Sequence, residues 1–309
     1  MSKMKLKLLS LAALLLIAPT AWADQVQVTQ NGDNGTVDIA QTPGAANANS
    51  ATVTQETKSV SEAVTVTQAG AGNQTAKVTQ GGDSDIAKVT QVGSQGSATI
   101  SQLANSVTGT ATITQDISSI AAQASVLQDN GTTNMATISQ NSVTAIDNAT
   151  ITQSGNNNTS MVIQTGSVSG VEMAFIGQIG NFNNAAINQV GGSNDKATIN
   201  QTGDFNSAEI NLTNTTGEEA SISQNASMNI STINEFGTGD KATVIQNSDN
   251  NKAYIIQGAG PGLSVGNIAS ITQGSGTGNT ATVNQTGTLK VADVKQNGTN
   301  NVTTVSQLN

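Results

Sequence analysis

The stretch NTATVNQTG, residues 279–287, alternates in a way that decides the fold. In an extended chain Asn279, Ala281, Val283 and Gln285 all point to one face, because successive side chains of a strand point to opposite sides. A strand with one dry face would bury the valine and leave the glutamine in water, yet here both share a side. The fold therefore has to bury the glutamine side chain and satisfy the hydrogen bonds of its amide.

Similar stretches recur along almost the whole sequence. The fullest units read Gln-x-Gly-x-x-Asn-x-Ala-x-(Ile/Val)-x-Gln, as in residues 178–189. Aligned on the final glutamine they give 24 units, and only Leu212 and Glu235 stand where the others have Gln. Each unit splits into an alternating, β-branched strand of about seven residues and a turn marked by Gly two residues after Gln.

Twenty-four strands with short turns could form a meander, a barrel or a solenoid. The similarity of the strands to one another distinguishes these architectures. In a solenoid each rung lies on the one before it, so every Gln stacks on a Gln and every Ile or Val on its like. A buried amide is then satisfied, because it donates to the carboxamide of the next rung and accepts from the previous one. The sequence predicts an all-β protein, a right- or left-handed β-solenoid of about 12 two-strand rungs with cross-β-like Gln and Asn ladders. The predicted ladder residues include Gln30, Gln55, Gln80, Gln102, Gln153, Gln178, Gln201, Gln246, Gln285, Gln307, Asn183, Asn206, Asn279 and Asn301.

Exceptions to the repeat have two readings each. Glu235 and Leu212 interrupt the Gln row, either as tolerated defects of a long array or as a pH-sensitive brake on assembly. Four aspartates take the Asn position where a strand begins, either as ordinary turn formers or as gatekeepers that slow aggregation inside the cell. These possible gatekeepers are Asp85, Asp147, Asp195 and Asp240, with Glu235.

The first residues are typical of a secretory leader. Lys3, Lys5 and Lys7 precede an apolar run from Leu8 to Ala18 and an A-x-A signal at residues 21–23. We expect a signal peptide over residues 1–23 and a repeat domain over residues 24–309. Removal of the signal peptide leaves 8 lysines and 20 acidic residues, a net charge of −12. This charge disfavours nucleic acid and acidic membranes as partners. No later segment is apolar enough to insert into a membrane.

The residue inventory argues against catalysis. The 309 residues include no Cys and no His, and all 11 basic residues are Lys. Thiol chemistry, imidazole catalysis and bidentate arginine clamps are therefore excluded. No acid pair lies with a His, Cys or Arg to suggest catalysis, and the Gly-Gly-x-Gly-x-Asp repeat of calcium-binding β-rolls is missing. We expect no enzyme activity, no cofactor and no metal.

The repeat Gln-x-Gly-x-x-Asn-x-Ala-x-x-x-Gln resembles the curlin repeat, the unit of bacterial curli fibre subunits, over nearly all of residues 24–309. The resemblance implies a protein of a Gram-negative bacterium that crosses the outer membrane unfolded through a dedicated curli secretion pore. It then assembles on the cell surface into a fimbrium of functional amyloid for cell adhesion and biofilm matrix. Its partners would be itself, a related curlin subunit and the pore. The chain lacks the Gly-rich export segment of the major subunit, and residues 201–206 look as much like the nucleator, so both roles stay open.

The terminal repeat units bear on fibre growth, and the outward-facing threonines suggest an alternative function. The terminal units ending at Gln30 and Gln307 are close to the consensus, which favours end-to-end growth by strand addition over a capped monomer. Outward Thr-x-Thr pairs instead resemble the ice-binding face of some β-solenoid antifreeze proteins, so a monomeric ice-binding or adhesin protein is the alternative. Those pairs are Thr52/Thr54, Thr65/Thr67, Thr112/Thr114 and Thr150/Thr152.

Overall fold

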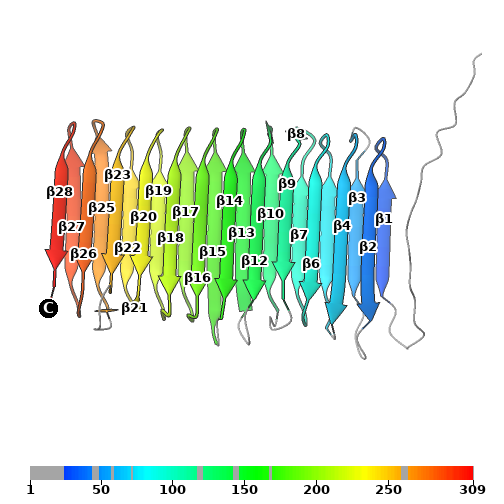
Figure 1. Ribbon diagram of the computed structural model, residues 1–309, viewed down its shortest axis with the longest axis horizontal. Coiled ribbons are helices and arrows are strands. Elements are labelled where there is room, and N and C mark those ends of the chain that lie inside the picture. The colour runs from blue at the N-terminus through cyan, green and yellow to red at the C-terminus, as the bar shows by residue number, and fades with distance from the viewer. Residues whose placement is uncertain are drawn as a thin grey trace, which may run out of the picture.

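The computed structural model of the protein is a rod of parallel β-strands, in which the described residues form no helix (Figure 1). The structure describes residues 24–43, 49–56, 59–70, 72–116, 121–141, 146–166, 169–258 and 264–308. The predicted leader, residues 1–23, lies outside them. Within these ranges no helix is long and apolar enough to cross a membrane.

Two sheets of 12 strands each make up the rod, and the chain visits them alternately. The first sheet contains β1 (Gln25–Gln30), β3 (Ser50–Gln55), β5 (Thr75–Gln80), β7 (Ser97–Gln102), β10 (Gln123–Asp129), β13 (Ile146–Ser154), β15 (Val171–Ile179), β17 (Lys196–Thr202), β19 (Glu219–Gln224), β22 (Lys241–Gln246), β25 (Ile268–Ser275) and β27 (Val291–Asn297). The second contains β2 (Thr36–Pro43), β4 (Ala63–Gly70), β6 (Ile86–Val92), β9 (Thr110–Gln115), β12 (Met135–Asn141), β14 (Thr159–Thr165), β16 (Asn184–Val190), β18 (Ser207–Thr213), β20 (Ile230–Glu235), β23 (Lys252–Gln257), β26 (Thr280–Gln285) and β28 (Val302–Gln307). One strand of each sheet forms a rung, so the β-solenoid with two strands per rung is confirmed.

Every strand pairs in the register that the repeat predicts. Ala149 lies beside Ala124 and Ala174, and Ile151 lies beside Val126 and Ile176. The inward Ala, Val and Ile side chains of both sheets form one core along the rod, and nearly all of them are fully buried. Like residues stack because the spacing in sequence equals one turn of the solenoid. The thin core therefore needs no large side chain.

The turns between the two sheets hold two features that the repeat did not predict. Short paired strands extend some turns, β8 (Ser106–Val107) with β11 (Gly131–Thr132) and β21 (Gly237–Thr238) with β24 (Ser264–Val265). Phe182 and Phe205 occupy adjacent turns with positive φ, and their rings stack 4.9 Å apart at an interplanar angle of 2°. The stacking follows from the in-register repeat, which places equivalent turn residues one strand spacing apart.

Gly180 lies in a turn that leaves no room for a side chain. Its φ is +117°, and a Cβ atom there would lie 2.1 Å from the carbonyl oxygen of Gly203 in the next rung. We predict that Gly180→Ala lowers the free energy of unfolding by about 1–3 kcal/mol, measured by urea unfolding. Gly217→Ala is the matched control, since Gly217 also has positive φ but open space around it. An equal loss in both variants would assign the effect to φ alone.

Candidate functional site

The glutamine row of the first sheet is a continuous ladder. Each Nε2 donates to Oε1 of the glutamine one rung further along, from Gln30 to Gln55 at 2.9 Å and onward to Gln296. The eleven bonds measure 2.8 to 3.2 Å. The second amide hydrogen reaches backbone carbonyls at the adjoining turn, as from Gln178 to Thr159 O at 3.0 Å. Glutamine is thus buried at little cost, because each amide has partners on both sides. The predicted members Gln30, Gln55, Gln80, Gln102, Gln153, Gln178, Gln201 and Gln246 all belong to this ladder.

The second sheet carries a parallel ladder that breaks once. Six amide bonds of 2.7 to 2.9 Å run from Gln41 to Gln189, and two more join Gln257, Gln285 and Gln307. Leu212 and Glu235 lie between these segments, in register and fully buried. The interruption expected from the sequence is therefore located in adjacent rungs of one sheet.

The asparagines of the strand entrances stack as predicted, but they bond differently. Asn183 Oδ1 accepts the backbone N–H of Asn206 at 3.0 Å, and its Nδ2 donates to Gly203 O at 2.8 Å. The same Oδ1-to-backbone contact joins Asn279 to Asn301 at 2.9 Å. The Asn row differs from the Gln row because the shorter side chain reaches the backbone of the next rung and not its carboxamide.

Acidic residues form a buried column at the strand entrances of the first sheet. Asp147, Glu172, Asp195, Glu218 and Asp240 occupy successive rungs, each six residues before the ladder glutamine, and each is 0 to 1 % exposed. We call these five residues the acidic column. Two of its aspartates replace Asn in kind: Asp195 Oδ1 accepts the N–H of Glu218 at 2.9 Å, and Asp240 Oδ1 accepts that of Asn267 at 2.7 Å. Asp195 and Asp240 therefore make the backbone contact that asparagine makes in other rungs, and both are buried.

Asp85 lies apart from the acidic column, in the second sheet. It follows Glu62 by one rung and accepts the N–H of Gly109 at 2.7 Å and the hydroxyl of Ser106 at 3.1 Å. Burial raises the pKa of Asp85 to about 6 and that of Glu62 to about 7. Both buried carboxyls, Asp85 and Glu62, therefore hold a proton more tightly than free carboxyls do.

Burial also dominates the titration of the acidic column and of Glu235. It raises the pKa of Glu218 to about 8, with the charge of Asp240 adding to the effect, and it raises the pKa of Asp195 and Asp240. The pKa of Glu235 lies well above its ordinary value, first through burial and then through the charges of Glu218 and Asp240. Burying a protonated carboxyl costs less free energy than burying an ionised carboxylate, which is why burial favours the protonated form.

Glu235 is fully buried in the ladder row, where an ionised carboxylate finds no donor among the described residues. It lies beside Gln257 in the ladder row, and neither carboxyl oxygen of Glu235 nor Oε1 of Gln257 has a hydrogen-bond partner among the described residues. A protonated Glu235 supplies the O–H donor that Gln257 Oε1 lacks and so stands in for a glutamine amide. An ionised Glu235 has no hydrogen to donate, so its carboxylate and Oε1 of Gln257 would be two acceptors facing each other.

Sequence reasoning missed three buried acids. Glu62, Glu172 and Glu218 lie six residues before a ladder glutamine, the same offset as Asp85 and Asp195. Reading that offset for every unit, and not only for Asn and Asp, would have found them. No group of three or more acidic residues in the described ranges has the geometry of a metal site.

No family model matches this sequence, and no curated protein is significantly similar to it.

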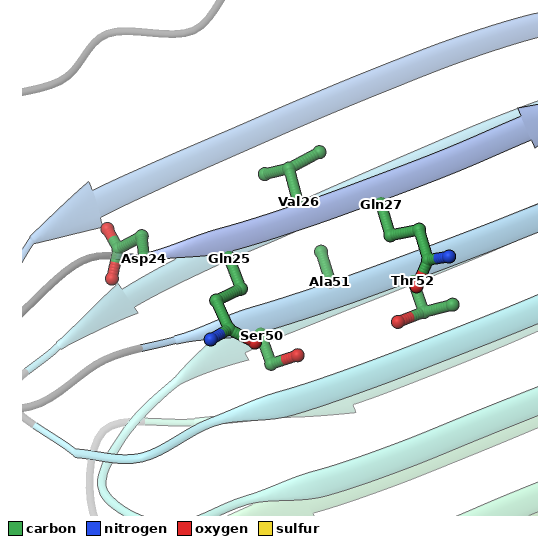
Figure 2. A pocket seen from close by; sticks show the side chains of 7 residues that line it. All are labelled: Asp24, Gln25, Val26, Gln27, Ser50, Ala51 and Thr52. Atoms are coloured by element: carbon green, nitrogen blue, oxygen red, sulfur yellow. The ribbon is translucent and has the colours of Figure 1, made fainter.

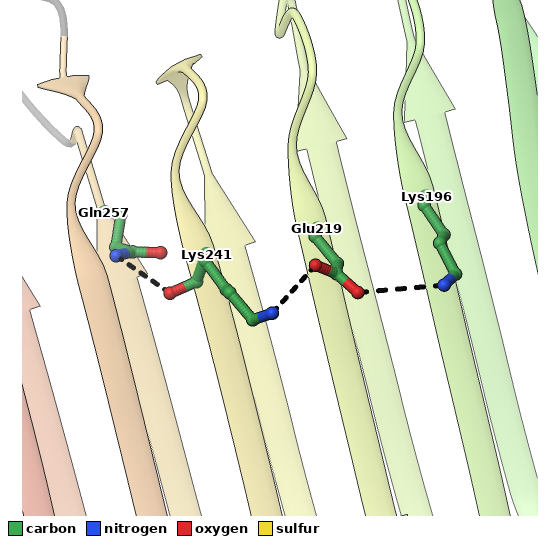
Figure 3. Close-up of polar contacts among 4 residues, drawn as sticks. All are labelled: Lys196, Glu219, Lys241 and Gln257. Atoms are coloured by element: carbon green, nitrogen blue, oxygen red, sulfur yellow. Dashed lines mark hydrogen bonds and ion pairs between the residues drawn. The ribbon is translucent and has the colours of Figure 1, made fainter.

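An exposed charge row runs outside the acidic column. Figure 3 shows Lys196, Glu219 and Lys241 on neighbouring strands, with Nζ to carboxylate distances of 3.7 and 2.9 Å, and Gln257 donating to Lys241 O at 3.5 Å. The hydrogen bond from Lys241 lowers the pKa of Glu219. These side chains are about half exposed, so each pair stabilises the fold only slightly.

The outward threonines do not form one uninterrupted array. Thr52 pairs with Lys77, Thr65 with Lys88, and Thr150 with Phe175. The Thr-x-Thr pairs lie on both sheets, with Thr52/Thr54 and Thr150/Thr152 on the first and Thr65/Thr67 and Thr112/Thr114 on the second. Charged and aromatic neighbours therefore divide the threonines into short groups.

Both ends of the rod lack a covering element among the described residues. β1 and β28 are half exposed on the face that is buried in every inner strand, and Val28, Ile39 and Val305 are only partly covered. Oε1 of Gln41, in the first rung, has no hydrogen-bond partner. Each end thus presents open strand edges and half-used amides.

Proposed function

We propose that the chain is a secreted structural subunit that assembles end to end into extracellular fibres, a curlin-like functional amyloid for adhesion and biofilm matrix. The observation that carries this proposal is the pair of uncovered ends, whose strands continue the register of the inner rungs. Addition of a further copy extends both sheets by strand pairing. Export through an outer-membrane pore and contact with a related curlin subunit follow from the repeat resemblance.

Seeded growth tests the proposal. The chain beginning at Asp24, diluted from denaturant, is followed by thioflavin T fluorescence with and without preformed seeds. We expect a lag that seeds remove, and fibres with a meridional reflection at about 4.7–4.8 Å. A folded β-sheet monomer that seeds do not convert would contradict the proposal. It would favour the alternative of a monomeric ice-binding or adhesin protein, which ice-crystal growth then tests.

Replacement of an end residue is expected to slow growth far more than replacement inside the rod. Gln30→Lys and Gln307→Lys place an uncompensated charge in the face that the next copy buries, so seeded elongation should fall about tenfold or more. Thr112→Lys and Thr114→Lys are the matched controls, because both threonines point outward from an inner strand. Elongation rates from thioflavin T traces make the comparison. Equal effects at the ends and inside would sink the end-template mechanism.

A further inference from the structure

The two ends of the rod carry opposite charges at equivalent positions. The residue six before the ladder glutamine is Asp24 in the first rung and Lys290 in the last rung of the same sheet. This position is buried in every rung between them, and Lys290 is the only cation that occupies it in this sheet. The next copy would bury both charges in the same way. An end face with one sign therefore suits the opposite end and repels its own kind.

Asp24 is prepared to receive a cation. Its Oδ1 accepts the backbone N–H of Asn49 at 2.9 Å, as asparagines do in the inner rungs, which leaves Oδ2 for a partner beyond the end. Figure 2 shows Asp24 where β1 begins, with Val26 turned to the same side as Ala51, and Gln25 and Gln27 turned to the other. At the opposite end the N–H of Lys290 donates to Asn267 Oδ1 at 2.7 Å, so its backbone already follows the column.

The amide ladders also have a direction. Every bond between ladder glutamines runs from Nε2 to the Oε1 of the rung nearer the C-terminal end, so the first rung offers acceptors and the last rung offers donors. Gln41 Oε1 has no partner, and Gln307 Nε2 donates only to Val291 O at 2.9 Å among the bonds of the described residues. An amide has two hydrogens, so Gln307 can donate once more. Donors meet acceptors only when the last rung of one copy faces the first rung of another.

We propose that the last rung (β27 and β28) of one copy binds the first rung (β1 and β2) of a second copy in one register, with Lys290 against Asp24. The inference rests on the proposed end-to-end assembly and adds its polarity and register. Gln296 then donates to Gln30 and Gln307 to Gln41 of the next copy. Such a head-to-tail contact is heterologous and does not close, so it generates an open fibre.

Other pairings of the ends lose these contacts. Two first rungs would bring Asp24 against Asp24 and acceptor against acceptor, while two last rungs would bring Lys290 against Lys290. A shift of two residues would keep inward faces inward but would set Lys290 against Val26 and take Gln296 off Gln30. The charge pair and the ladders therefore select the same arrangement independently.

A charge swap tests the register. We expect Asp24→Lys and Lys290→Asp each to slow seeded elongation by about tenfold or more, since each leaves two like charges at a buried contact. The double variant restores the pair in reverse and is expected to return elongation to within about threefold of the parent chain. Lys77→Asp, on the outward face of an inner strand, is the control and should have little effect. Circular dichroism of each monomer checks that folding is intact. A double variant no faster than either single variant would overturn the proposal.

Cross-linking tests the polarity, because the chain has no native cysteine. Chains with Thr29→Cys are mixed with chains with Lys295→Cys, and fibres are treated with a short bifunctional thiol reagent. The proposal predicts 29–295 dimers, and no 29–29 or 295–295 products. Gln25→Cys mixed with Lys295→Cys is the out-of-register control, since residue 25 lies about 13 Å further along the strand. Products joining like ends, or equal yields from the control, would overturn the inference while assembly itself stands. Failure of the parent chain to elongate seeds would overturn both proposals.

Discussion

The folded chain is expected to lose stability as the pH rises from about 4.5 to about 8, the reverse of the usual behaviour of proteins that pair their carboxylates. Burial raises the folded-state pKa of Glu62 to about 7, of Asp85 to about 6 and of Glu218 to about 8. Below the unfolded-state values both states are protonated and the stabilisation is fully present. Between the unfolded-state and the folded-state pKa values, the unfolded chain has lost these protons while the folded chain keeps them, so the free energy of unfolding falls as the pH rises. Above the folded-state values both states are ionised and the stabilisation is lost.

The size of this effect follows from the shifts. Each unit of pKa difference between the folded and unfolded states corresponds to about 1.4 kcal/mol, so the three shifts together predict a loss on the order of 10 kcal/mol across the window. Urea unfolding of the chain beginning at Asp24, kept dilute to suppress assembly, measures the free energy of unfolding at several pH values. A stability that is constant or rises with pH would contradict the prediction.

A triple variant isolates the buried acids from every other titrating group. Glu62→Gln, Glu218→Gln and Glu235→Gln together remove three carboxyls that are at most 1 % exposed and keep their length. The variant is expected to show a much flatter dependence on pH. Glu209→Gln is the matched control, because this side chain points outward from β18, and it should leave the slope unchanged. If the slope persists in the triple variant, the stability loss has another origin.

Repair of the broken ladder is expected to give the largest gain in stability at neutral pH. Leu212→Gln with Glu235→Gln creates an uninterrupted row from Gln41 to Gln307. The new amide at 212 accepts from Gln189, and the new amide at 235 satisfies Oε1 of Gln257, which has no partner in the described structure. We expect the free energy of unfolding to rise by about 2–4 kcal/mol, because an orphaned buried acceptor and a buried carboxyl are removed together.

The intact ladder supplies the control for the repair. Gln102→Leu interrupts the first sheet at one rung, where Gln80 donates to it at 3.0 Å and it donates to Gln128 at 2.9 Å. This change is expected to lower the free energy of unfolding by about 1–3 kcal/mol. Urea unfolding at neutral and acidic pH compares the variants, and the advantage of the repaired chain should shrink in acid, where Glu235 is protonated in both states. A repaired chain no more stable than the parent would show that the ladder tolerates the break without cost.

Most of the fold follows from the repeat. An offset of six residues from a buried position to a ladder glutamine specifies which side chains face inward, as for Asn183 and Gln189, whatever the rung length. The bonding of asparagine could not be read from the repeat, because the sequence shows that an amide is present but not which groups lie within its reach. The stacked pair Phe182 and Phe205 also escaped prediction, since turn residues follow no hydrophobic period.

The sequence by itself determined the strands, their inward faces and the stacking of glutamine on glutamine, because an in-phase repeat gives each residue the same neighbour in every stacked rung. Only the tertiary structure showed in which direction the amides donate and how deeply the acidic residues at the strand entrances are buried. With two strands per rung, Asp147, Asp195 and Asp240 join Glu172 and Glu218 in one buried column, while Asp85 lies in the other sheet beside Glu62. Their burial, and hence the raised pKa values of the acids, depends on the neighbouring rungs and sheet, which lie more than 20 residues away in the sequence.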